Sequence, residues 1–432
     1  RLLAIGACVT AECEERTGFC NGMHLLGAAA KGDCWAGCMK HSDDGGRSWS
    51  RIERVMPSDD DFWVGMLLRE RRSGDIILQR VMPSFKPNPG AVVQVRSTSG
   101  GATWSAPTDI SAMLGPLFSP GKGKGLIDDQ MLNVGPSTQA LQLSATNPHH
   151  PHRILFAGHH GAYEYDVIWF SDDFGASYTL AKNASDPSKP AQLWGQDEIA
   201  LAETPDGGVI ASTRNELFHA GYAGHESTCN CRGLARSGDG GSTFGESAPD
   251  PVLVGPVCQA TMLTVPSRGP GGGLTIFHAN PSHGTPKESK SPPDGRASGI
   301  VRRSETGGRT WEASVVLNGH EAYAYSCLTE VPQPGFIGLA FETVLPGSDI
   351  RKTASANNVV FVVIPQNFSD DQSTLKTDDT AGEIDLDGSW HFATADGAFV
   401  GNVTTPGVWQ SQGIGAETAL LRHQYVGVAS YS

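Results

Sequence analysis

The sequence predicts an all-β fold, namely a six-bladed β-propeller followed by the start of a β-sandwich. The first observation is a short repeat, S-x-D-x-G-x-x-W, which occurs five times in intact or altered form. The second is composition, because 53 glycines and 27 prolines among 432 residues indicate many turns. The third is a β-like apolar stretch directly before a repeat, as at 91–95 and 167–170.

The repeats, called boxes below, begin at Ser42, Ser97, Ser171, Ser237 and Ser304, with starts 55 to 74 residues apart. The second box has Ser in place of Asp and the fifth has Thr, while the third and fourth end in Tyr and Phe. In such a turn the Asp or hydroxyl oxygen can accept backbone N–H groups, glycine adopts unusual backbone angles, and the aromatic ring covers the turn. The turn joins antiparallel strands, so the spacing fits four-stranded blades, whose radial repetition protects sheet edges.

Composition and charge narrow the class of protein. Hydrophobic residues make up 39% of the chain, which is enough for a sizeable core. The formal net charge of -14 argues against nucleic acid as the main partner, because phosphate binding needs a basic surface. The negative net charge is still compatible with a local basic pocket that binds a small anion. No apolar run has the length needed to span a bilayer.

Nine cysteines favour disulfides, and with them a secreted, cell-surface or lysosomal location. A metal site is the weaker alternative, because no CxxC pair is matched by a second one. Three Asn-x-Ser/Thr sequons, at Asn183, Asn367 and Asn402, add slight support for a glycoprotein. The chain opens at Arg1 into an apolar stretch, so we expect it to begin inside a longer protein. The cysteines are Cys8, Cys13, Cys20, Cys34, Cys38, Cys229, Cys231, Cys258 and Cys327.

Three domain segments are expected. The propeller covers 1–366, since the repeat region ends near Ile364, and the polar stretch 367–380 is typical of a linker. Residues 381–432 contain Leu386-Asp387-Gly388-Ser389-Trp390-His391-Phe392, and this stretch resembles the start of the sugar-binding β-sandwich of the β-galactosidase family. The alternative is a β-rich tail that packs on the propeller.

The boxes predict the fold and not the activity, because they recur in unrelated propellers. A more specific signal is the stretch 195–215, in which Glu198 opens one strand, an Asp-Gly turn follows and Arg214 closes the next strand. This stretch resembles the mid-chain segment of the sialidase (neuraminidase) superfamily. A hairpin brings its two ends together, so both side chains can reach one end of the propeller.

Two later segments continue this resemblance. The stretch before the fifth box resembles the family segment in which an Arg leads the entering strand, and Arg296 fits that place, with Arg302 and Arg303 as alternatives. The stretches 322–328 and 338–342 resemble the A-Y-S-D-L strand and its L-Y-E partner. Tyr325 matches the nucleophile, and Glu342 matches the carboxylate that steadies one arginine.

The resemblance implies a chemistry for these residues. Arginine binds the carboxylate of sialic acid bidentately. A neutral tyrosine nucleophile avoids repulsion by that carboxylate, and sialidases are an exception to the usual pair of carboxylates. With a phenol pKa of about 10, tyrosine needs a base, for which Glu198 is the candidate. An acid is also required, and Asp33 is the best match, although a simple turn Asp explains it equally well.

The resemblance also implies a third arginine. In the family it precedes an apolar strand similar to Leu2–Ile5, so we expect it upstream of Arg1. Arg16 is a weaker candidate for a further contact in the pocket. No cofactor and no metal are implied.

The leading hypothesis is an exo-α-sialidase that hydrolyses terminal sialic acid from glycoconjugates with retention. It rests on the order of Glu198, Arg214, Arg296, Tyr325 and Glu342 between the boxes. Each residue alone is explained equally well without a function, because a single Arg is usually a solvated surface residue and a single Tyr in a strand usually belongs to the core. The alternative is a catalytically inactive propeller that binds glycans or acts as a scaffold. A third possibility is a propeller hydrolase or lyase that acts on another acidic sugar.

Overall fold

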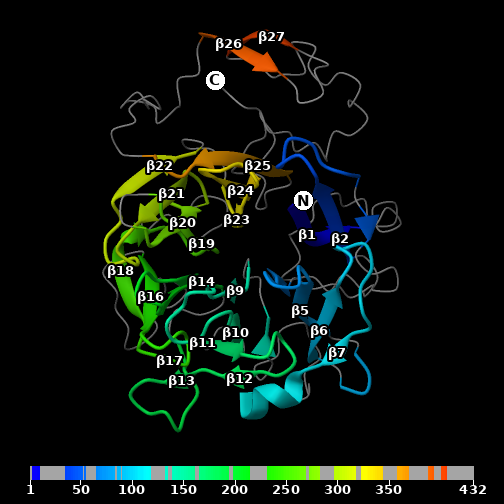
Figure 1. Cartoon of the computed structure of the whole chain (residues 1–432), viewed down its shortest axis with the longest axis vertical. Coiled ribbons are helices and arrows are strands. Elements are labelled where there is room, and N and C mark those ends of the chain that lie inside the picture. Colours follow the sequence, from blue (N-terminus) through cyan, green and yellow to red (C-terminus); the bar gives the residue numbers. More distant parts are fainter. Residues whose placement is uncertain are drawn as a thin grey trace.

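The structure is a computed structural model in which the strands form a β-propeller, arranged as a ring of sheets around a centre (Figure 1). It describes residues 2–9, 35–51, 53–54, 65–82, 85–88, 90–117, 132–134, 139–160, 165–193, 198–214, 231–268, 272–282, 296–317, 323–343, 358–368, 388–393 and 400–405. In this part of the chain the sole helix is a short 3₁₀ segment, η1 (Ser111–Leu117). No helix here is long and apolar enough to cross a membrane.

Three sheets have four strands in chain order, with each strand antiparallel to the next. This is the expected blade. The sheets are β4 (Gly65–Arg69), β5 (Ile76–Met82), β6 (Ala91–Ser97) and β7 (Thr108–Asp109); β14 (Ile199–Glu203), β15 (Val209–Thr213), β16 (Cys231–Ser237) and β18 (Ala248–Val254); and β19 (Thr261–Pro266), β20 (Leu274–Pro281), β21 (Gly299–Ser304) and β22 (Ala313–Val316).

Three further sheets complete the ring. A five-stranded sheet has β10 and β11 at its centre, and two sheets have three strands each. A short parallel pair links two neighbouring blades near their boxes. These strands are β8 (Leu132–Asn133), β9 (Leu141–Gln142), β10 (Ile154–His160), β11 (Tyr165–Ser171) and β12 (Thr179–Leu180); β1 (Leu2–Val9), β2 (Trp35–Ser42) and β3 (Glu53–Arg54); β23 (Ser326–Glu330), β24 (Phe336–Thr343) and β25 (Asn358–Pro365); and the pair β13 (Lys182–Asn183) and β17 (Thr243–Phe244).

The predicted all-β propeller of the sialidase type is confirmed. In the part of the chain that the structure describes, the propeller arrangement is found for five blades, which is consistent with the six-bladed propeller that the sequence predicts. Among the described residues two sheets, β1–β3 and β23–β25, have three strands instead of four.

Each box begins at the last residue of a strand and folds as the sequence predicts. In the first box, Ser42 Oγ accepts the Gly46 N–H at 2.8 Å, and Asp44 Oδ1 accepts the Ser48 N–H at 2.9 Å. In the altered boxes a hydroxyl replaces the carboxylate, because Ser99 Oγ accepts the Thr103 N–H at 2.8 Å. Thr306 Oγ1 accepts the Thr310 N–H at 2.9 Å in the same way. One oxygen of either kind is therefore sufficient to hold the turn.

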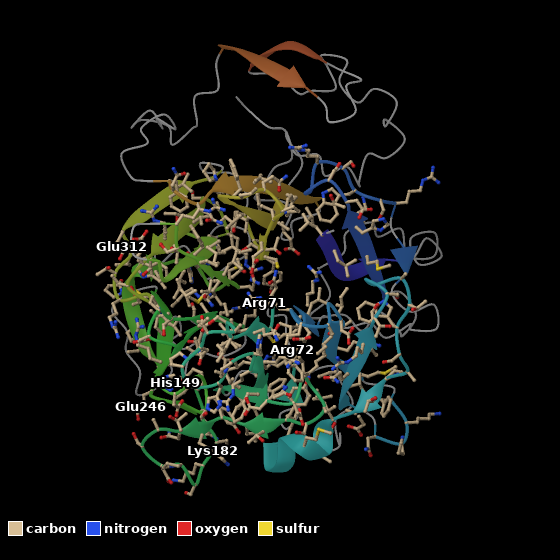
Figure 2. The ribbon with its side chains drawn as sticks, viewed as in Figure 1. Arg71, Arg72, His149, Lys182, Glu246 and Glu312 are labelled. Carbon is tan, nitrogen blue, oxygen red and sulfur yellow. The ribbon has the colours of Figure 1, made fainter. Side chains whose placement is uncertain are left out.

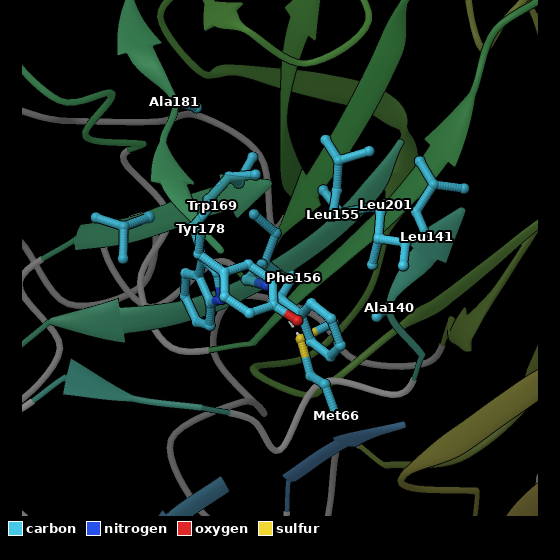
Figure 3. Close-up of a cluster of buried hydrophobic side chains, with 14 of the residues drawn as sticks. Met66, Ala140, Leu141, Leu155, Phe156, Trp169, Tyr178, Ala181 and Leu201 are labelled. Atoms are coloured by element: carbon cyan, nitrogen blue, oxygen red, sulfur yellow. Dashed lines mark hydrogen bonds between the residues drawn. The ribbon is translucent and has the colours of Figure 1, made fainter. Parts of the chain in front are cut away.

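The largest hydrophobic cluster lies between neighbouring blades. Phe156 and Trp169 stack with ring centroids 6.5 Å apart, and Tyr178, the last residue of the third box, meets Phe156 edge-on at 5.9 Å (Figure 3). Met66 of the preceding blade packs into the same cluster. All four side chains are buried, so the aromatic residue of this box contributes to the core as well as to its turn.

Polar side chains add links between blades. Arg71, which lies near the centre of the ring, donates from Nη2 to Glu330 Oε1 at 3.0 Å and from its backbone N–H to Gln142 Oε1 at 2.8 Å (Figure 2). Glu312, by contrast, lies at the rim. Such contacts are needed because neighbouring blades belong to separate sheets and share no continuous ladder.

Beyond the propeller the structure describes one antiparallel hairpin, β26 (Gly388–Ala393) with β27 (Val400–Thr405). It contains the expected Trp390. Most of the proposed linker and of the segment 381–432 lies outside the described residues. The division of the chain into three segments therefore stays a prediction.

Candidate active site

Glu198 and Arg214 lie side by side because they flank one hairpin. Glu198 comes directly before β14 and Arg214 directly after β15, and the Arg214 N–H donates to the Glu198 carbonyl at 2.9 Å. Their side chains form an ion pair, with 2.8 Å between Arg214 Nη1 and Glu198 Oε2. The Glu198 side chain is 1% exposed and that of Arg214 is 10% exposed. This is the juxtaposition that the sequence predicts.

Arg296 and Tyr325 approach each other from two neighbouring sheets. The Arg296 guanidinium carbon lies 5.4 Å from the centroid of the Tyr325 ring, which is within the range of a cation–π contact. The Arg296 carbonyl accepts the Tyr323 N–H at 2.9 Å. Gly299 lets the Tyr323 ring pack directly against the start of β21, because a Cβ at position 299 would lie 2.1 Å from that ring.

Glu342 joins the site through the backbone of β24. Its N–H donates to the Tyr325 carbonyl at 2.8 Å, and its carbonyl accepts the Ala324 N–H at 3.0 Å. These bonds extend the pairing of β23 with β24 beyond Ser326, so Glu342 faces the segment that carries Tyr325. The structure thus brings together Glu198, Arg214, Arg296, Tyr325 and Glu342.

Burial and charge raise the proton affinities of two of these groups. Burial raises the pKa of Tyr325 well above its ordinary value; the Glu198 charge adds to this, while Arg214 and Arg296 oppose it. Burial also raises the pKa of Glu342 to about 8, against the opposing effect of Arg296. Tyr325 is therefore a neutral phenol at ordinary pH, and Glu342 is largely protonated below about pH 8 in the free protein.

The alternatives to Arg296 have other partners. Arg302 donates from Nη1 to Asn280 Oδ1 at 2.9 Å. Arg303 donates from Nη1 to the Gln366 carbonyl at 3.3 Å, and its guanidinium lies over the Phe368 ring. Both lie within β21, whereas Arg296 precedes it. The register of this strand thus singles out Arg296 as the arginine beside Tyr325.

Two expected residues cannot be placed. Asp33, the candidate acid, and Arg16, the candidate further contact, lie outside the described residues. Both therefore stay predictions. In the described part of the chain no group of three or more His, Cys, Asp or Glu side chains is arranged to hold a metal ion.

Sequence reasoning missed two buried polar residues beneath the site, Arg232 and Gln259. Arg232 is 1% exposed and donates to the carbonyls of Glu198 and Cys258. Gln259 is 2% exposed and exchanges two hydrogen bonds with the backbone of Ser326, the residue after Tyr325. The run 255–260 resembles a family strand, but the sequence gives no reason to assign it a role. A polar side chain that binds backbone groups leaves no spacing pattern by which it could be found.

The described site contains a buried carboxylate paired with a guanidinium, a second guanidinium over a phenol ring, and a carboxyl whose pKa is raised. Cations beside a phenol stabilise its anion, and they would attract an anionic ligand.

The chain matches a known family over most of the propeller. The family described as BNR repeat-like domain matches residues 38–338. A protein described as a sialidase, from Micromonospora viridifaciens, is 27% identical over 340 residues, which are 72% of this chain and 45% of that protein. The chain therefore spans less than half the length of this relative.

Solved structures share the fold. Hadza microbial sialidase Hz136 superposes with a TM-score of 0.52 at 20% identity, covering 72% of this chain and 57% of that one. The intramolecular trans-sialidase from Ruminococcus gnavus, solved in complex with oseltamivir carboxylate, gives a TM-score of 0.53 at 17% identity, with 73% and 84% covered. At these identities the likeness concerns the fold alone. The match of the BNR repeat-like domain family over residues 38–338 shows that the chain belongs to the sialidase superfamily of proteins with BNR repeats.

Proposed function

We propose that this protein is an exo-α-sialidase that hydrolyses terminal sialic acid from glycoconjugates with retention, with Tyr325 as the nucleophile. The observation that carries the proposal is the surroundings of Tyr325, a half-buried residue beside Arg296 and under the electrostatic influence of the Glu198–Arg214 ion pair.

The arginines would select an anionic sugar. Arg214 and Arg296 present planar guanidinium groups, and such groups bind a carboxylate bidentately. Arg214 already shares its charge with Glu198 at 2.8 Å, so a substrate carboxylate would lie near the second charge, that of Arg296. Sialic acid carries its carboxylate on the anomeric carbon, and this would set that carbon close to the Tyr325 ring.

Glu198 would make the Tyr325 phenol a nucleophile. An ionised Glu198 opposes ionisation of Tyr325 because two anions would then lie together. Transfer of the phenol proton to Glu198 leaves the total charge unchanged and removes that repulsion, while both arginines stabilise the phenolate. The Tyr325 oxygen would then form a bond to the anomeric carbon as the bond to the leaving oxygen breaks. An acid, for which Asp33 is the candidate, would give that oxygen its proton.

The covalent intermediate would be released by water. The same acid, now deprotonated, would take a proton from the water molecule, which attacks the anomeric carbon as the bond to Tyr325 breaks. The proton held by Glu198 would return to the phenolate. Two displacements restore the original configuration, so the product keeps the α configuration. Sialylated glycans are the expected partners, and a secreted, cell-surface or lysosomal location would give access to them.

The test is release of a fluorogenic leaving group from an aryl α-sialoside, measured for the wild-type protein and for Tyr325→Phe. We expect turnover by the wild type and a loss of about 10³-fold or more in kcat for Tyr325→Phe. Unchanged turnover in Tyr325→Phe would contradict the role of Tyr325. Binding of the sialoside without turnover by the wild type would favour the alternative, a glycan-binding propeller.

A further inference from the structure

A continuous set of buried contacts connects Glu198 with Tyr325, although the two residues belong to different sheets. Glu198 precedes β14, Tyr325 precedes β23, and the sheet that begins with β19 is the intervening one along the chain (Figure 1). The contacts run through Arg232, the peptide segment 258–259 and Ser326. We call this set the buried bridge.

Arg232 forms the first half of the buried bridge. Its Nη2 donates to the Glu198 carbonyl at 3.2 Å, and its Nη1 donates to the Cys258 carbonyl at 2.7 Å. Further bonds from Nε and Nη2 reach the hydroxyl and the carbonyl of Ser212, at 2.8 and 3.3 Å. All four acceptor atoms are neutral oxygens, and burial lowers the pKa of Arg232 to about 10. A guanidinium that stays charged at neutral pH is thus used to hold backbone, not to pair with a carboxylate.

Gln259 forms the second half. Its Nε2 donates to the Ser326 carbonyl and its Oε1 accepts the Ser326 N–H, each at 2.9 Å. A side-chain amide that meets both backbone groups of one residue replaces a strand neighbour at that point. Ser326 is bonded directly to Tyr325 in the chain, so the amide of Gln259 fixes the peptide next to the phenol.

Such a bridge is needed because of how a propeller is built. The sheets that contain β14, β19 and β23 have no ladder between them. Apart from the bond between the Tyr323 N–H and the Arg296 carbonyl, side-chain contacts therefore set their relative positions at the site. One neighbouring contact has the same character, since Thr261 Oγ1 accepts the Leu328 N–H at 3.0 Å. Catalysis that depends on proton transfer between Glu198 and Tyr325 is sensitive to their separation, because a misplacement of about 1 Å can cost roughly 10²-fold in rate.

We propose that Arg232 and Gln259 are positioning residues that set the location of Tyr325 relative to Glu198 through the segment 258–259. This inference rests on the proposed function for its catalytic consequence, but not for the backbone contacts themselves. Neither residue touches the reacting atoms. Both act through the peptide groups of Glu198 and Ser326.

The first experiment compares Gln259→Met with Gln142→Met. Gln142 is a matched control, because it is a buried glutamine that links two other blades through Glu70 and Arg71. We expect Gln259→Met to lower kcat by about 10²-fold with KM changed by less than about 3-fold, whereas Gln142→Met lowers thermal stability and leaves kcat within about 2-fold. Equal kcat values in the two variants would overturn the proposal.

A double-mutant cycle tests whether the bridge acts as one unit. If Arg232→Lys and Gln259→Met interrupt the same set of contacts, the double variant should lose no more kcat than the more impaired single variant. If the two fold-losses multiply, the residues act separately and the single bridge is wrong. Gln259→Asn, which keeps the amide on a shorter side chain, serves where Gln259→Met does not fold.

Hydrogen exchange separates a failure of this inference from a failure of the proposed function. We expect the Ser326 amide to exchange at least about 10-fold faster in Gln259→Met or Gln259→Asn than in the wild type, with no such change in Gln142→Met. An unchanged rate would overturn the bridge even in an active enzyme. If the wild type turns over no sialoside, the proposed function fails and the exchange result still decides whether Gln259 holds the Tyr325 segment.

Discussion

In each box turn the polar side chains find their partners within eight consecutive residues, whereas the polar groups of the candidate site find theirs on other strands of the same sheet or on a neighbouring sheet. Asp239, for example, accepts the N–H and the hydroxyl of Thr243 at 2.9 and 2.8 Å. Glu198, by contrast, depends on Arg214 across a hairpin and on Arg232 across the next strand. The boxes are held locally and the site is held by the tertiary structure.

The difference has an energetic reason. The box carboxylates lie near the surface; burial is the largest single effect and raises their pKa, but the hydrogen bonds within the turn together lower it below its ordinary value, as for Asp44 and Asp239. At the site the charged groups are removed from water. A buried charge without a partner costs several kcal/mol, so each site residue relies on the others.

The largest expected effect is the removal of one partner of the buried ion pair. Arg214→Met leaves the Glu198 carboxylate buried beside an apolar side chain, and we expect it to lower the free energy of unfolding by about 3–5 kcal/mol. Urea denaturation measures this. The double variant Glu198→Gln/Arg214→Met should recover much of the loss; a double variant as unstable as Arg214→Met would argue against a buried charge as the cause.

Glu342 should make stability depend on pH. Its pKa is raised from 4.5 to about 8 in the folded state, so the folded protein binds more protons than the unfolded one between these values. The contribution of Glu342 to the free energy of unfolding should therefore be greatest below about pH 4.5 and should fall, by on the order of a few kcal/mol, as pH rises to about 8.

The measurement is the difference in unfolding free energy between the wild type and Glu342→Gln from pH 4 to 9. Gln imitates the protonated carboxyl and does not titrate, so the difference isolates this group. A difference that stays constant over this range would mean that Glu342 is ionised in the folded protein.

The smallest effects are expected in the boxes. Asp239→Ala removes an acceptor of three hydrogen bonds at the surface and should lower the free energy of unfolding by roughly 1–2 kcal/mol. Thr306→Val in the fifth box should cost less, roughly 0.5–1 kcal/mol, because a neutral hydroxyl is a weaker acceptor. Neither change should alter kcat by more than about 2-fold. A folded box variant that lost activity would contradict the separation between the locally held boxes and the candidate site.

The same contrast explains what could be predicted from the sequence. The turn structure of the boxes can be predicted directly, because the hydrogen-bond partners of their side chains lie within the motif. The repetition of the boxes in turn predicts the propeller. Glu198 with Arg214 could be paired because a hairpin joins them. Arg296 could not be separated from Arg302 and Arg303 until the register of β21 was known.

The roles of Arg232 and Gln259 could not be predicted from the sequence for a different reason. Their partners include backbone groups of residues up to 67 positions away, such as Glu198, Cys258 and Ser326, and backbone groups carry no residue-type signal. The tertiary placement of the peptide segment 258–259 gives these side chains their role.

The most direct test of the account is the configuration of the first sugar released by the wild-type protein from an α-sialoside, followed by NMR before mutarotation. The account predicts α-sialic acid, because attack by Tyr325 and then by water inverts the anomeric carbon twice. If the first-formed product is instead the β-anomer, a single displacement by water takes place and Tyr325 is not the nucleophile.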